Sequence, residues 1–216
     1  MATPTIKQDR PAHRGAGGDL ALFAQRFLED RFAGFNKDIA ICLTGRPAEG
    51  RSGLTYAYFP ALMACCGTLE YLACMYHGIR KCNEKQVAAY CAEFMTQPAY
   101  DAEGVRLLFE GFRHKVAHHG IASGVWHDRV HHRRITWSVG PDRDPPAMRL
   151  HDDIRSLMSD PPWPCSVTHT AEIHLGCLAE DIRNSALGPH GYGAALQGRN
   201  DLLTKFIQCM SYMYPR

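Results

Sequence analysis

The sequence has no strong excess of charge of either sign. Its 24 Lys and Arg residues and 22 Asp and Glu residues give a formal net charge of +2 with histidine neutral. A balance of this size does not by itself indicate a nucleic-acid or membrane-surface partner. Twelve histidines are present, however, and mild acid would charge several of them and make the surface distinctly basic.

The chain also lacks the cysteine patterns of zinc ribbons and thioredoxin-like sites. Its nine cysteines are an odd number and include no Cys-x-x-Cys pair. Several lie in apolar runs, among them Cys65, Cys66 and Cys74, where a thiol behaves as a small hydrophobic side chain. This usage is typical of a reducing compartment, so we expect a cytoplasmic protein.

No segment has the pattern of a signal peptide or of a clear membrane span. Residues 1–18 are polar, rich in Pro and Gly, and have no apolar centre, which predicts a flexible N-terminal tail. The longest apolar run, 54–75, is interrupted by Pro60, Gly67 and Glu70 and favours a buried helix. We therefore expect a soluble protein without a membrane partner.

Loop motifs for cofactors are missing as well. There is no Gly-x-Ser-x-Gly, and the glycine-rich stretch 188–193 lacks the Lys-Ser/Thr of a phosphate loop. We expect this stretch to be a connection, and we predict no cofactor and no resident metal.

What is present is helical periodicity over most of the chain. Apolar spacing predicts helices at about 19–35, 36–43, 58–77, 84–96, 102–118, 167–186 and 198–212. Residues 129–139 alternate and are β-branched, which predicts a small β-hairpin near 128–150. The sequence thus predicts a mainly α fold, with residues 19–216 forming a single helical-bundle domain that carries a β-hairpin insertion.

The most suggestive segment lies at the end of the helix predicted at 102–118, where residues 113–119 are Arg-His-Lys-Val-Ala-His-His. A helix C-terminus favours protonated imidazole, so His118 or His119 can titrate near neutral pH. Such a group both accepts and donates protons, and the guanidinium of Arg113 can stabilise charge on phosphorus. These are the groups needed to cleave RNA without a metal.

Ideal helix geometry limits this interpretation. Positions five apart on an α-helix point about 140° away from each other, so Arg113 and His118 do not share a face. Either the helix loosens at Ala117, or the site is composite across a symmetric dimer. His114 and His118, four apart, do share a face.

An Arg-x-x-x-x-His segment at a helix end, with a polar residue after the arginine, resembles the signature of the HEPN superfamily. Arg113 and His118 match it, with His114 where asparagine is commonest. The apolar helix that carries Glu70 resembles the superfamily's earlier core helix, which often bears a polar residue facing the motif. Residues 107–113, followed by His and a strand-like segment, are also similar to an uncharacterised bacterial branch of HEPN-like proteins.

The resemblance implies a helical bundle that forms a homodimer with the two motifs facing each other. In active members, the arginine and histidine are the catalytic pair of a metal-independent endoribonuclease. Carried over, these are Arg113 and His118, with His114 as the supporting polar residue and Glu70 as an acidic partner. Other members act as binding or scaffold domains, without demonstrated activity.

Basic residues near the motif are candidates for holding RNA phosphates. They are Lys115, His119, Arg129, Arg133 and Arg134. The alternative for the basic stretch 127–134 is a solvated hairpin edge, where positive charge discourages strand pairing between molecules.

Three functions stay open at this point. The first is a homodimer that binds RNA or a nucleotide and cleaves RNA through the Arg-x4-His motif. The second is a non-catalytic interaction or scaffold protein with a protein partner, in which Arg113 pairs with Glu70 or Glu110. The third is a metal-dependent hydrolase that uses His114, His118 and acidic residues distant in the sequence, although Lys115 between the two histidines opposes a metal.

Overall fold

The computed structural model of the protein describes residues 16–47, 54–95, 98–114, 124–143, 146–158 and 165–215. Its helices are α1 (Ala16–Cys42), α2 (Tyr58–His77), α3 (Glu84–Phe94), α4 (Ala102–Arg106), α6 (Leu175–Leu187), α7 (Tyr192–Gly198) and α8 (Asn200–Met213). A 3-10 turn, η1 (Pro98–Tyr100), precedes α4, and a π-helical segment, η2 (Leu107–Arg113), continues it. The strands are β1 (Arg46–Pro47), β2 (Leu54–Thr55), β3 (Trp126–Asp128), β4 (Arg133–Gly140), β5 (Met148–Met158) and β6 (Cys165–His174).

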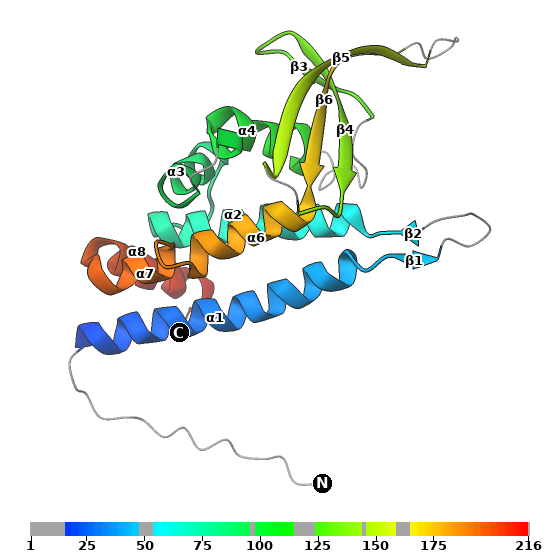
Figure 1. The fold of residues 1–216 in the computed structure, drawn as a ribbon. Helices are drawn as coiled ribbons and strands as arrows, with labels where there is room; N and C mark the ends of the chain where they lie inside the picture. Colours follow the sequence, from blue (N-terminus) through cyan, green and yellow to red (C-terminus); the bar gives the residue numbers. More distant parts are fainter. Residues whose placement is uncertain are drawn as a thin grey trace.

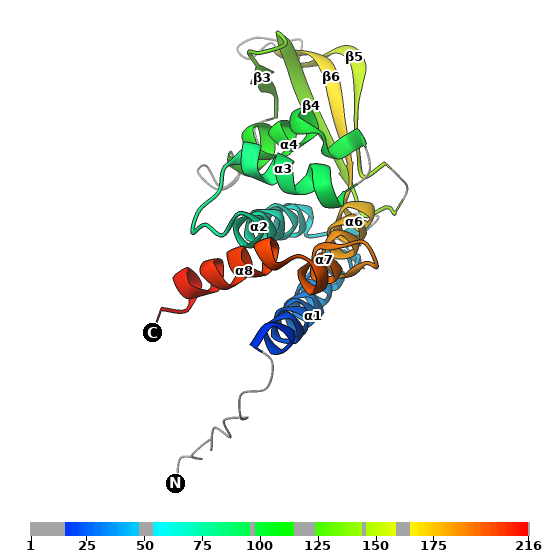
Figure 2. The ribbon, with the colours of Figure 1, turned by 90° about the vertical axis from the view of Figure 1, so that its left-hand side faces the viewer.

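The helices and the sheet occupy different parts of the molecule. Helices α1, α2, α6, α7 and α8 form the lower part in Figure 1, and the sheet of β3–β6 rises above them beside α3 and α4 (Figures 1 and 2). Strand β6 runs directly into α6 at Leu175. One cluster of buried apolar residues includes members from both parts, such as Leu72 of α2 and Ile173 of β6. The sheet is thus joined to the helices by packing as well as by the chain.

Helix α2 is the central helix, as its nearly continuous apolar sequence predicts. It contacts α1, α3, α6, α8 and η2, and Leu62, Leu69 and Met75 are fully buried. Burial of each such side chain contributes roughly 1.5–3 kcal/mol. The predicted C-cap, Gly78, adopts φ 71°, in the left-handed region where a residue without Cβ is favoured.

By length and composition, α2 is apolar enough to cross a membrane, and it is the one helix of the described residues that meets this criterion. Half of its apolar window is buried against other elements. The packing of α2 therefore accounts for much of the hydrophobicity that this criterion detects.

The predicted fold class is wrong in its β component. The chain forms a four-stranded mixed sheet in the order β3-β4-β6-β5, in which β4 and β6 are parallel and the other pairs are antiparallel. The protein is therefore a mixture of α and β structure, and not a helical bundle with a hairpin insertion. Residues 167–174, predicted as the first turns of a helix, belong to β6.

The physical reason is long-range pairing. Strand β6 pairs with β4 in the register Ile135↔His169, across 34 positions of sequence. Its buried apolar side chains, including Val167 and Ile173, form a short run. The spacing of apolar residues in such a short run does not distinguish a buried strand from a helix. The sequence that follows is helical, so the pattern alone favours one long helix.

Segment η2 is where the sheet packs on the helices. Gly111 is buried, and a Cβ there would lie 2.8 Å from ring atoms of both Trp126 of β3 and Trp137 of β4. Phe112 is fully buried, with its ring centroid 5.7 Å from that of Trp137. The absence of a side chain at position 111 therefore allows the two tryptophans to approach the backbone that leads to Arg113.

Candidate functional site

Arg113 stands at the last residue of η2. The chain winds with π-helical hydrogen bonds over Leu107–Arg113. The loosening predicted at Ala117 lies outside the described residues. A π-helical segment pairs residue i with residue i+5 and often lies at a functional site. It also changes which residues share a face within Leu107–Arg113, whereas the 140° offset between Arg113 and His118 concerns positions beyond this segment.

Arg113 forms an ion pair with Glu70. Its Nη2 donates to Oε2 of Glu70 at 2.7 Å, and the two side chains are 26% and 24% exposed. Glu70 lies in the middle of α2, 43 positions earlier in the sequence. The structure thus brings together two of the four residues predicted to be catalytic.

Two buried or half-buried thiols surround this pair. Burial, with a further contribution from Glu70, raises the pKa of Cys66 to about 12, while Arg113 lowers it slightly. The thiol of Cys82 donates to the carbonyl oxygen of Glu70 at 3.3 Å. Cys66 is therefore a protonated thiol at neutral pH and acts as packing, not as a nucleophile.

The other predicted motif residues are only partly placed. His114 follows η2 directly and is half-buried. His118, Lys115 and His119 lie outside the described residues, so their predicted roles stay predictions. No group of three or more His, Cys, Asp or Glu side chains in the described ranges is arranged to hold a metal ion.

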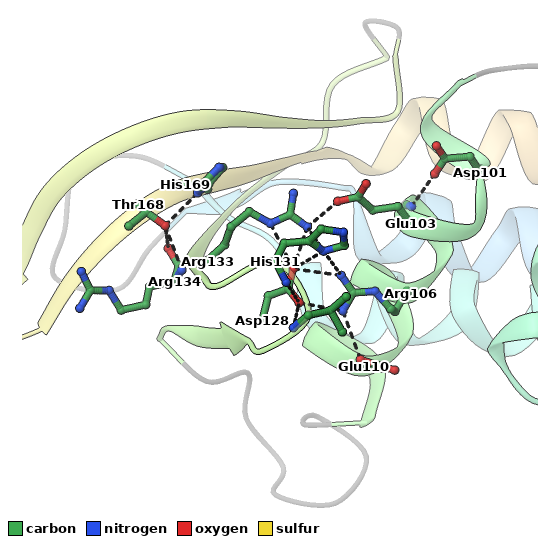
Figure 3. A network of polar contacts seen from close by, with 12 residues as sticks. Asp101, Glu103, Arg106, Glu110, Asp128, His131, Arg133, Arg134, Thr168 and His169 are labelled. Carbon is green, nitrogen blue, oxygen red and sulfur yellow. Dashed lines mark hydrogen bonds and ion pairs between the residues drawn. The ribbon is translucent and has the colours of Figure 1, made fainter.

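A second polar cluster lies where β3 and β4 meet α4, and it centres on the buried carboxylate of Asp128 (Figure 3). Arg106 donates from Nη1 and Nη2 at 3.0 and 2.9 Å, and Arg133 donates from Nε and Nη2 at 3.1 and 2.7 Å. The Nδ1 of His131 lies 3.1 Å from Oδ2, and the backbone N–H of Val130 donates to Oδ1 at 3.1 Å. The carboxylate is therefore surrounded by donors.

These donors decide the protonation state of Asp128. Burial alone would raise its pKa, but hydrogen bonds from Arg106, Arg133 and His131 outweigh burial and hold the pKa well below its usual range. The cluster is completed by two more carboxylates, since Arg106 also contacts Glu110 at 3.4 Å and Arg133 also contacts Glu103. It fixes the hairpin turn against α4 and η2.

The predicted phosphate-binding arginines have different surroundings. Arg133 is engaged by Asp128 and Glu103, so a phosphate would have to compete with two carboxylates for it. Arg129 and Arg134 have exposed side chains. Among these three residues, the geometry favours Arg129 and Arg134 for a ligand contact, and it favours a structural role for Arg133.

Sequence reasoning missed Asp128 and Arg106 as the centre of this cluster. The available signals were Asp128 and Arg133, five positions apart in the basic stretch 127–134, and Arg106 four residues before Glu110 on one helix face. Each is an ordinary surface pattern taken alone. Only the fold brings Arg106 into contact with Asp128.

Comparison with protein-family models, with curated proteins and with solved structures found no match to this chain.

Proposed function

We propose that the protein binds single-stranded RNA and cleaves it without a metal ion, at the site that Arg113 marks at the end of η2. The observation that carries the proposal is the ion pair between Arg113 and Glu70. This pair engages Nη2 of the arginine, whereas a guanidinium has five N–H donors in a fixed fork. The carboxylate thus fixes the direction of the side chain while other donors remain to contact a phosphate.

The chemistry needs one proton acceptor, one cation and one proton donor. His118, assigned from its spacing to Arg113, takes the proton of the 2′-hydroxyl, and the 2′-oxygen forms a bond to phosphorus. Arg113 stabilises the charge on the phosphorane. The bond to the 5′-oxygen then breaks, and an imidazolium supplies the proton to that oxygen. The products are a 2′,3′-cyclic phosphate and a 5′-hydroxyl.

A homodimer and a cytoplasmic location are parts of this proposal. In a symmetric dimer, each motif can lie opposite its copy, so the histidine that donates the proton need not come from the same chain as the one that accepts it. Exposed Arg129 and Arg134 supply further positive charge for the RNA backbone.

The second candidate function is a non-catalytic interaction protein. The Arg113–Glu70 contact is equally expected of a purely structural motif. One observation favours this candidate. Large apolar side chains are exposed on α1, on α8 and just after α8, including Phe23, Tyr212 and Tyr214, of the kind that partner surfaces use.

Cleavage of end-labelled single-stranded RNA in excess EDTA separates the candidates. The proposal expects cleavage by the native protein with 5′-hydroxyl ends, and loss of cleavage in His118→Ala and Arg113→Ala. The matched controls are His190→Ala and Arg26→Ala, two exposed residues away from η2. Absence of cleavage across several RNAs would favour the interaction protein, and activity only with added metal would favour a metal-dependent hydrolase.

A further inference from the structure

An aromatic cavity of about 430 Å³ opens between the start of α2 and strand β4. Its size is within the range of small-molecule sites. Four aromatic residues among its lining are Tyr56, Tyr58, Phe59 and Trp137. The described motif residues Glu70, Arg113 and His114 do not line this cavity, which lies next to Phe112 of η2.

The walls of the cavity are suited to a flat ring. The rings of Tyr56 and Tyr58 are stacked, with centroids 5.2 Å apart and an interplanar angle of 9°. Phe59 is 45% exposed although it is a large apolar side chain. Because the two tyrosine rings cover one face of each other, a planar ligand would stack on the outer side of this pair or on the exposed ring of Phe59, as bases stack on aromatic side chains of proteins that bind single-stranded nucleic acids.

An uncharged lining disfavours a phosphate inside the cavity. None of the described residues that line it carries a charge. Tyrosine hydroxyls are protonated at neutral pH and can donate, and the pKa of Tyr58 is raised further by burial and by Tyr56 and Asp142 nearby. Neutral aromatic walls with hydroxyl donors match a nucleobase, and they leave the charged backbone of the ligand outside.

The cavity is connected to Arg113 through one residue. The ring of Phe112 lies 5.7 Å from the ring of Phe59 and 5.7 Å from that of Trp137, and Arg113 follows it in the chain. Phe59 and Glu70 are eleven residues apart on α2, which is about 16 Å along the helix. Arg113 pairs with Glu70, so a ligand that reaches both the cavity and Arg113 must be longer than one nucleotide.

We propose that this cavity binds a nucleobase of the RNA, a few nucleotides away from the phosphate that Arg113 contacts. The inference rests on the proposed RNA binding and adds the base-binding site to it. The ribonucleoside of 2-aminopurine fills the cavity alone. A single-stranded RNA of eight nucleotides fills the cavity and contacts Arg113 at the same time, and therefore binds more tightly.

The test measures binding to the full chain in EDTA, by quenching of 2-aminopurine fluorescence, of two ligands. One is the 2-aminopurine ribonucleoside, and the other is an eight-nucleotide RNA that contains one 2-aminopurine and carries 2′-O-methyl groups, so that the 2′-oxygen cannot attack phosphorus and the RNA stays intact. Phe59→Ala removes one wall, and its matched control is Phe23→Ala on α1, which is 49% exposed against 45% for Phe59. Tyr56→Ala is the second variant, in case the loss of Phe59 disturbs Phe112.

Loss of one stacking wall corresponds to a weakening of about 5- to 150-fold. We expect this loss for both ligands in Phe59→Ala and in Tyr56→Ala, and no change in Phe23→Ala. Arg113→Ala is expected to weaken binding of the eight-nucleotide RNA and to leave nucleoside binding unchanged.

Two results would overturn the base-binding site. One is a native protein that does not quench the nucleoside, and the other is equal binding by Phe59→Ala, Tyr56→Ala and Phe23→Ala. If the RNA still binds in an Arg113-dependent way in either case, the proposed function stands without this cavity. Nucleoside binding that depends on Phe59 and Tyr56, without tighter binding of the RNA, would support the cavity and count against the proposed function.

Discussion

Asp128→Asn removes the charge on which two guanidinium groups converge, and we expect a large loss of stability. The buried carboxylate accepts four hydrogen bonds of 2.7–3.1 Å from Arg106 and Arg133. Breaking a buried ion pair by removal of one partner costs about 3–5 kcal/mol. Because Arg106 keeps Glu110 and Arg133 keeps Glu103, we expect the lower end of that range, about 3 kcal/mol.

Urea unfolding at pH 7, followed by circular dichroism, measures this loss. In thermal unfolding of a chain of this length, the same loss of about 3 kcal/mol lowers Tm by about 6–12 °C. The matched control is Asp152→Asn, whose carboxylate is 89% exposed and lies 3.1 Å from His169. An exposed pair of this kind contributes about 0–1 kcal/mol. Equal small losses in the two variants would refute the structural role given to Asp128.

The loss of unfolding free energy in Asp128→Asn is also expected to depend on pH. The hydrogen bonds from Arg106 and Arg133 hold the folded-state pKa of Asp128 well below its usual range, against the effect of burial. A carboxyl with a lowered folded-state pKa stabilises the fold above its unfolded pKa of about 3.9, and loses this effect as the pH falls toward the folded-state value. The difference in unfolding free energy between native protein and Asp128→Asn is therefore complete at pH 7 and narrows below about pH 4. A difference that stays constant down to the acid limit of the fold would contradict the ionised network.

Four further variants lie in η2 or on α2, the helix that η2 contacts. Gly111→Ala places a Cβ 2.8 Å from the rings of Trp126 and Trp137 and should lower the unfolding free energy by about 1–3 kcal/mol. Gly67→Ala, on α2 with nothing within 4 Å, should raise it by about 0.5–1 kcal/mol, and denaturant unfolding compares the two. Glu70→Gln removes the charged partner of Arg113 and is expected to lower RNA cleavage while the far-UV spectrum stays native, so unchanged cleavage would show that the pair does not position the arginine. The logarithm of the binding constant for single-stranded RNA falls linearly with the logarithm of the salt concentration, and Arg113→Ala should reduce the size of this slope by about 0.7 because one phosphate contact is lost. An unchanged slope would place the arginine away from the RNA.

Parts of the fold with local causes were predictable from the sequence. The bounds of α2 match the predicted 58–77, because its apolar pattern, Pro60 in its first turn and Gly78 at its end all act within one helix. Helix α1 begins at Ala16, within the predicted tail, and runs unbroken to Cys42 across two predicted pieces.

The sheet was not predictable in the same way. Its central parallel pair joins β4 to β6 across 34 positions, and strand pairing over such a distance leaves no local period. The turn at Asp128 looks like a solvated basic hairpin until Arg106 is brought to it by the packing of Gly111 on Trp126 and Trp137.

The candidate site, too, was only partly predictable from the sequence. The resemblance to a known motif pointed to Glu70 as a partner of Arg113, and the two residues are in contact. The aromatic cavity had no sequence signal, because Tyr56 and Phe59 lie 78 or more positions before Trp137. Residue types that are ordinary in the sequence become a site only where the start of α2 meets β4.

The most direct test of the central claim is cleavage of end-labelled single-stranded RNA by native protein in excess EDTA, with His118→Ala and His190→Ala assayed in parallel. The account predicts 5′-hydroxyl products from the native protein and from His190→Ala, and none from His118→Ala. Cleavage that survives in His118→Ala, or its absence in the native protein with every RNA tested, would contradict a metal-independent ribonuclease at the end of η2.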